Sequence, residues 1–196
     1  IKEKMDLDIQ VQKLKLLKSN FLSEKYSLED KIIKYYPQRI ASLHSRIEGL
    51  KADVKTAQEH PKPTDDRFAG MEVKGVFYSE KAEAGKAIID ACKEMNSPDP
   101  VPLGAYRGFT TELLFDTVER QYVVRLKGET SRNVPLGEDI HGNITRLDNG
   151  IERFEEMLKG AENDLENTEK QFETAKAEAE KPFSKEEELK SKMARL

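Results

Sequence analysis

Five basic side chains in the middle of the chain could bind phosphate groups. Lys74, Arg107, Arg125, Lys127 and Arg132 fall in segments whose alternating apolar residues are typical of strands. Arg125 and Lys127 are two residues apart, so in a strand their side chains share one face of the sheet. Guanidinium and ammonium groups are the donors that proteins use on the nucleic-acid backbone. The five residues therefore form a candidate DNA-binding face, with an ordinary solvated sheet face as the alternative.

No pattern for catalysis, for a cofactor or for a metal is visible in the sequence. The glycines are scattered, and none forms a phosphate loop ending in Gly-Lys-Ser/Thr. His44, His60 and His141 are too far apart to put two ligands on one helical face. Cys92 lies on the apolar face of a predicted helix without a neighbouring histidine, so we expect a buried thiol and not a nucleophile. We therefore expect no catalytic, cofactor-binding or metal-ligating residues in this chain.

The composition is typical of long solvated helices. Of the 196 residues, 36% are charged and 7% are aromatic, and the formal net charge is -4. No run approaches the roughly 18 apolar residues of a membrane span, so no membrane partner is expected. The helical pattern is already under way at residue 1 and continues to residue 196, which predicts an internal fragment of a larger protein.

Heptad spacing predicts a long helix at each end of the chain. In residues 143–196 we expect Asn143 to cap the helix, Pro182 to break it, and Ser184 with Glu187 to restart it as a capping box. In residues 1–60 we expect a kink near Pro37 and an end near Glu59. The first stripe continues upstream through Leu14, Leu17, Phe21 and Leu28. The two main seams comprise Tyr36, Ile40, Leu43, Ile47, Leu50 and Val54, and Ile144, Leu147, Ile151, Phe154, Leu158, Ala161, Leu165, Thr168, Phe172, Ala175 and Ala179.

These helices are expected to pair antiparallel as a coiled-coil arm. Residues 1–60 carry 12 basic and 9 acidic side chains, whereas residues 143–196 carry 10 and 14, so the charges favour pairing. We take Val54 to face Ile144 as the starting point. The order of the seams then places Leu50 near Leu147, Ile47 near Ile151, Leu43 near Phe154 and Ile40 near Leu158. The small residues Gly160 and Ala161 would lie opposite Tyr36 and Pro37. Residues 5–36 carry more apolar groups than one stripe needs, which predicts packing on other domains of the parent chain or self-association.

The residues between the helices, 61–142, predict a small α+β module at the tip of the arm. A Pro- and charge-rich linker over 61–68 leads into a strand over 71–78 that slips at Gly75, as at a bulge. Ser79 is expected to cap a helix that ends before Asn96–Pro100. Strands follow over 106–116, 122–126 and 131–136, with a turn over 117–120 and with Pro135 marking an edge strand. The predicted fold class is therefore α+β: a long antiparallel helical hairpin with an inserted module.

Two blocks of sequence resemble a known family. One runs from Lys2-Glu3-Lys4-Met5-Asp6-Leu7-Asp8 to Tyr36-Pro37; the other includes Gly104-Ala105-Tyr106-Arg107-Gly108-Phe109, Gly142-Asn143-Ile144-Thr145-Arg146-Leu147-Asp148-Asn149 and Lys181-Pro182-Phe183. Together they resemble the C-terminal region of large bacterial proteins of mobile elements that combine a Swi/Snf-type helicase with an adenine-specific DNA methylase-like part. The helicase and methylase motifs of that family are missing here, so no catalytic residue is carried over.

The resemblance implies an accessory, non-catalytic region in the bacterial cytoplasm. ATP and Mg²⁺ would belong to the parent helicase, and the partners would be the parent's other domains and duplex DNA. The alternative is a structural coiled-coil spacer or a dimerisation module, self-associating through residues 5–36, with no nucleic-acid role.

Overall fold

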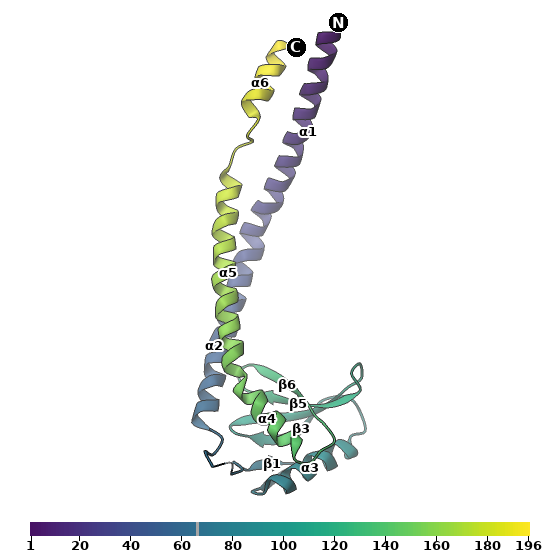
Figure 1. The fold of residues 1–196 in the computed structure, drawn as a ribbon, viewed down its shortest axis with the longest axis vertical. Coiled ribbons are helices and arrows are strands. Elements are labelled where there is room, and N and C mark those ends of the chain that lie inside the picture. The colour runs from purple at the N-terminus through teal and green to yellow at the C-terminus, as the bar shows by residue number, and fades with distance from the viewer. Residues whose placement is uncertain (66) are drawn as a thin grey trace. The chain divides into compact units, whose positions relative to one another are not determined.

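A computed structural model describes residues 1–65 and 67–196, so the predicted 61–68 linker lies partly outside the described residues. The chain divides into two compact units (Figure 1). One comprises residues 1–43 and 163–196, and the other comprises residues 44–162. The fold mixes helices with a six-stranded antiparallel sheet, which confirms the α+β class.

The N-terminal helical segment runs without a break from Lys2 to Glu59. It consists of α1 (Lys2–Asp30), a π-helical turn (Lys31–Tyr35) and α2 (Tyr36–Glu59). Pro37 has no N–H to donate to the preceding turn, and its ring crowds that turn. The chain responds with a widened turn, in which the N–H of Tyr36 donates to the carbonyl of Lys31. The irregularity expected near Pro37 is thus a π-helical turn just before it, and the predicted end near Glu59 is confirmed.

The C-terminal segment forms three helices, α4 (Gly142–Glu152), α5 (Phe154–Glu180) and α6 (Glu186–Arg195). The interruption around Pro182 confirms the predicted break, but a further interruption at Arg153 was not predicted. The predicted C-terminal heptad seam is confirmed as a buried stripe, because every seam position from Ile144 to Ala179 is buried or half-buried. In the N-terminal seam the same holds from Tyr36 to Val54, whereas Leu17 is 45% exposed and does not belong to it.

Three predicted helix caps are wrong. Asn143 lies inside α4, where its side-chain amide bonds both the N–H and the carbonyl of Gly137. The free N–H groups at this helix start are instead bonded by Asp139, whose carboxylate accepts from His141 and Gly142. The N-cap position of α3 (Lys81–Glu94) is Glu80 and not Ser79, without a side-chain cap. In α6 it is Lys185, so the expected Ser184–Glu187 capping box does not form.

Within the first unit, α1 and α6 pack antiparallel. Phe21 contacts Phe183 with ring centroids 5.5 Å apart, and Lys18 forms a 2.9 Å ion pair with Glu186. Val11, Leu14 and Leu189 form a buried cluster beyond them, and the two chain ends lie close together at this end of the unit (Figure 1).

The predicted register is wrong at Tyr36. Its ring stacks on Phe172 at 5.4 Å, and not against Gly160 and Ala161. From Tyr36 back to Phe21 the first helical segment uses 15 residues, whereas the partner segment uses 11 from Phe172 to Phe183. An extended residue spans about 3.3 Å against about 1.5 Å in a helix, so the stretch between α5 and α6 covers the same distance with fewer residues.

Six strands form one antiparallel sheet in the order β2-β1-β3-β4-β5-β6. They are β1 (Met71–Val73), β2 (Val76–Tyr78), β3 (Val101–Tyr106), β4 (Phe109–Asp116), β5 (Gln121–Lys127) and β6 (Ser131–Pro135). The turn over 117–120 and the edge position of β6 with Pro135 are confirmed.

Two hairpin turns were not predicted. The slip at Gly75 is a two-residue turn between β1 and β2, and the expected strand over 106–116 begins in a second turn at Arg107-Gly108. Both pairs have positive φ at each residue, at 49° and 82° and at 45° and 82°, which is the geometry that joins antiparallel strands tightly. Strand β3, which ends at the second turn, was missed altogether.

Helices cover one face of the sheet; the opposite face, which carries Arg125 and Lys127, is named the open face here, and Val123 on it is buried. The covered face carries Met71, Phe109, Thr111, Leu113, Val124 and Leu126, all buried. Gly150 allows α4 to approach closely, because a Cβ there would lie 2.6 Å from the Val134 side chain. Residues of α2 belong to the same unit: the Asp53 carboxylate accepts N–H bonds from Glu129 and Thr130 in the β5–β6 turn, at 2.8 Å each.

The outward side of α1 and of the π-helical turn after it carries large exposed apolar residues. Met5, Ile9, Leu16, Tyr26 and Ile33, here named the outer stripe, are 52–71% exposed. Their spacing follows a heptad repeat of its own, distinct from the inward positions Val11, Leu14 and Phe21. Among the described residues, no helix is long and apolar enough to cross a membrane.

Candidate nucleic-acid interface

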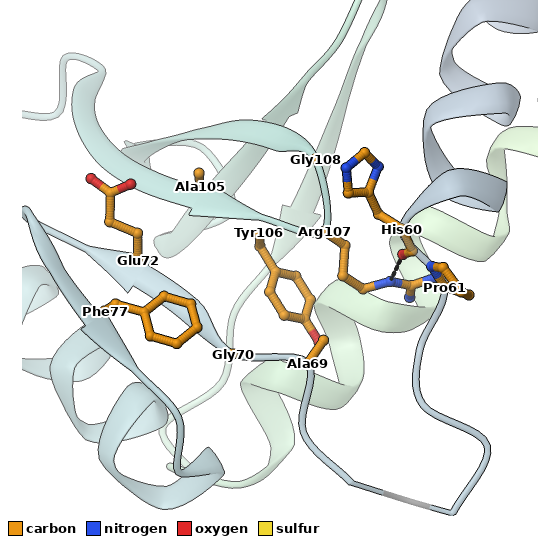
Figure 2. Close-up of a pocket in the computed structure, with 10 residues that line it drawn as sticks. All are labelled: His60, Pro61, Ala69, Gly70, Glu72, Phe77, Ala105, Tyr106, Arg107 and Gly108. Atoms are coloured by element: carbon orange, nitrogen blue, oxygen red, sulfur yellow. Dashed lines mark hydrogen bonds between the residues drawn. The ribbon is translucent and has the colours of Figure 1, made fainter.

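Arg107 is buried and is not a surface cation; with Tyr106 and Asp148 it forms a hydrogen-bonded cluster, here named the clamp. It lies in the β3–β4 turn, and its side chain is 2% exposed. Its Nη1 donates to Asp148 Oδ1 at 3.1 Å, Nη2 donates to Glu152 Oε1 at 3.1 Å, and Nε donates to the carbonyl of His60 at 2.9 Å. Figure 2 shows the guanidinium turned toward that carbonyl at the end of α2. Arg107 therefore ties the turn to α4 and α2 and is not free for phosphate.

Tyr106 completes the clamp. Its hydroxyl donates to Asp148 Oδ1 at 2.6 Å, and the side chain is buried. Burial raises the pKa of Tyr106 far above its usual range, and the hydrogen bond to Asp148 acts in the same direction. The Asp148 carboxylate thus accepts from two neighbouring residues of one turn.

A pocket of about 400 Å³ opens beside this clamp (Figure 2). Phe77 and Glu72 lie across it from Arg107, and the ring of Tyr106 stands between them. The imidazole of His60 and the guanidinium of Arg107 lie at its rim, and both contact backbone carbonyls. His60 Nδ1 lies 2.9 Å from the Thr56 carbonyl, and Arg107 Nε donates to the His60 carbonyl. The pocket is largely apolar and presents no pair of groups arranged for acid–base chemistry among the described residues.

Lys74 lies apart from the remaining predicted residues. It occupies the β1–β2 turn and forms a 2.9 Å ion pair with Glu94 of α3. Strands β1 and β2 are at the opposite side of the sheet from β5 and β6.

Arg125 and Lys127 share the open face, as their spacing predicts. Both are paired with Glu112 on the neighbouring strand, Lys127 at 2.8 Å and Arg125 at 3.4 Å. The hydrogen bond from Lys127 is the main cause that lowers the pKa of Glu112. One carboxylate thus faces two cations, which leaves this part of the sheet with a positive excess.

Arg132 belongs to the covered face, but it lies on the edge strand β6 and lines one hollow together with Arg125 and Lys127. It pairs in register with Leu126, and its Nη1 lies 3.2 Å from the Met157 sulfur. Its Nε is buried without a hydrogen-bond partner in the described structure. Burial lowers the pKa of Arg132, and the charge of Arg153 adds to that lowering. A guanidinium left with an unused donor beside a second guanidinium is a favourable site for an anion.

Two hollows meet along the edge strand β6 and bring these cations together. One of about 520 Å³ is lined by Arg125, Lys127 and Arg132 with Ser131, Asn133 and Met157. The other, of about 290 Å³, lies between β6 and α4 and is lined by Arg132, Arg146 and Arg153 with neighbouring asparagines. We name Arg125, Lys127, Arg132, Arg146 and Arg153 the basic edge.

The basic edge includes three of the five predicted residues and two that were not predicted. Arg146 and Arg153 are seven residues apart, so they lie on one side of the helical segment. That spacing was a usable signal, but only packing shows that this side faces β6. The ion pairs at this edge are those of Arg125 and Lys127 with Glu112, while the charge of Glu156 acts on Arg132 and opposes the lowering of its pKa.

Other chemistry finds little support in the side-chain arrangement. In the described parts of the chain, no cluster of three or more His, Cys, Asp or Glu residues could hold a metal ion. Cys92 is 8% exposed, and burial raises its pKa to about 11, so its thiol is protonated at neutral pH.

Comparisons of the chain with protein-family models, with curated proteins and with solved structures find no match.

Proposed function

We propose that this chain is a non-catalytic accessory region that contacts nucleic-acid phosphates through the basic edge. The observation that carries the proposal is the meeting of Arg125, Lys127 and Arg132 with Arg146 and Arg153 around β6, where an arginine Nε is left unbonded. Arginine forks suit phosphate oxygens, and a groove between a strand edge and a helix can follow a backbone.

The helical segments are proposed to form an antiparallel hairpin arm that carries the α+β module. The opposed contacts of α1 with α6 support this arrangement, as does the stacking of Tyr36 on Phe172. The resemblance to mobile-element Swi/Snf-type helicase and methylase-like proteins supplies the proposed setting, the bacterial cytoplasm. In that setting the region would position the motor, or hold DNA beside it, while ATP and Mg²⁺ serve the parent helicase.

Fluorescence anisotropy with a labelled duplex at low salt tests the proposal. The wild-type chain should bind, and Arg132→Gln and Arg153→Gln should each weaken binding across all DNA sequences. Each lost phosphate contact should reduce the slope of log K against log salt by about 0.9. Lys86→Gln, an exposed change on α3, is the matched control and should leave binding unchanged.

Binding that responds equally to the control and to the two arginine variants would reject the basic edge. A chain that does not bind duplex DNA at low salt would support the second candidate, a coiled-coil spacer or dimerisation module. The exposed outer stripe of α1 favours that candidate.

A further inference from the structure

The outer stripe, which runs along α1 into the π-helical turn, has no partner among the residues that the structure describes, although its side chains are large and apolar. Met5, Ile9, Leu16, Tyr26 and Ile33 remain 52–71% exposed while the opposite side of the same helix packs on α6. A helix with two apolar stripes is suited to a bundle of more than two helices. The stripe extends over a length on the order of 45 Å.

We propose that a second copy of this chain covers the outer stripe, with the two α1 helices antiparallel about a twofold axis near residue 21. The register follows from matching like with like along the heptads. Ile9 then faces Ile33 of the second copy, and Leu16 faces Tyr26. The polar positions of the stripe also match, since Ser19 meets Ser23 and Gln12 meets Asp30.

The charges that flank the stripe are self-complementary in this register. In antiparallel coiled coils the flanking positions of one helix face the equivalent positions of the other. Asp6 then faces Lys34, and Lys15 faces Glu29, each twice per dimer because of the twofold axis. Near the axis, Asn20 faces Asn20 and Leu22 faces Leu22.

A parallel pairing of the same helices is disfavoured. It would stack Asp30 on Asp30 in the stripe, and it would place Gln12 against Gln12. In the parallel register Lys15 faces Asn20, so its charge has no partner. A charge reversal at Lys15 should therefore weaken an antiparallel dimer, in which Lys15 faces Glu29, and have little effect on a parallel one, in which it faces Asn20.

Sedimentation equilibrium of the full chain up to about 100 µM tests the interface. We expect a dimer, and Lys15→Glu should raise its Kd about tenfold, because two exposed attractions become repulsions. The double variant Lys15→Glu/Glu29→Lys should restore wild-type association. Lys4→Glu makes the same charge change away from the stripe and should have little effect. A monomer throughout this range, or a dimer indifferent to Lys15→Glu, would overturn the proposal.

Cysteine cross-linking fixes the orientation. Asn20→Cys should form a disulfide-linked dimer under mild oxidation, because residue 20 faces itself across the axis. Ile33→Cys should not, since residue 33 faces residue 9; a cross-link there would show parallel helices and refute the register. The native Cys92 does not interfere, because it is buried with a raised pKa. The inference is independent of the basic edge, whose residues lie in the other unit, so failure of either leaves the other standing.

Discussion

Replacing Arg107 with Met should cost much of the stability of the unit that contains the sheet. The Arg107 side chain is 2% exposed and the Asp148 side chain is 11% exposed, so the substitution leaves a carboxylate in a poorly solvated place. Removing one partner of a buried ion pair costs about 3–5 kcal/mol. Since domains are stable by only about 5–15 kcal/mol, urea unfolding followed by circular dichroism should show a clear shift of the midpoint.

The contribution of Asp148 can be separated from that of Glu152. Glu152 is 67% exposed, so Glu152→Gln should change the free energy of unfolding by less than about 1 kcal/mol. Asp148→Asn alone should be strongly destabilising, because it leaves the Arg107 charge buried. The double variant Arg107→Met/Asp148→Asn should lose about 1–3 kcal/mol less than the sum of the single variants.

A loss below about 1 kcal/mol for Arg107→Met would refute the clamp. Strict additivity of Arg107→Met and Asp148→Asn would refute it as well. Either result would mean that the Arg107–Asp148 pair contributes little to the net stability of this unit.

Three further outcomes are expected. The folded-state pKa of Cys92, about 11, lies above its usual value of 9.0. The stability that the buried thiol contributes is therefore intact below pH 9 and is lost as the pH rises toward 11. Alkylation of Cys92 at pH 8 should be slow until urea is added. Asp53→Ala should lower the free energy of unfolding by about 2 kcal/mol, since it strips the bonds that hold the β5–β6 turn. Gly85→Ala should lower the thermal midpoint, because its Cβ would lie 1.7 Å from the Ile140 carbonyl oxygen, whereas Gly160→Ala, with open space around it, should raise it.

Helical stripes could be predicted from the sequence because large apolar residues repeat with the heptad period. Every position from Tyr36 to Val54 and from Ile144 to Ala179 that the spacing selects is buried or half-buried. The register was harder, since it depends on how far the chain travels per residue. A π-helical turn before Pro37 and an extended stretch around Pro182 both change that distance between the Tyr36–Phe172 contact and the Phe21–Phe183 contact.

The two hairpins were missed because their turns have unusual residues at the first position. Tight two-residue turns are most readily predicted from Asn-Gly or Asp-Gly, whereas here Lys74 and Arg107 occupy the first position. Arg107 can hold a positive φ because its guanidinium is fixed by three hydrogen bonds to residues distant in sequence. Such support is a tertiary effect and cannot be seen in the turn itself.

The candidate site was predicted only in part, for a similar reason. Alternation in β5 correctly placed Arg125 and Lys127 on one face. Arg146 and Arg153 come from a helical segment whose position beside β6 depends on the close approach at Gly150. Lys74 was assigned to the same surface because both ends of the sheet look alike in sequence, although the strand order separates them.

The most direct test of the basic edge is an amide chemical-shift titration of the ¹⁵N-labelled chain with a short duplex at low salt. The largest shifts should fall on residues 125–135 and on 146–153, and they should diminish as salt is added. Shifts confined to α1, or to the pocket beside Tyr106, or absent at saturating duplex, would contradict binding at the basic edge.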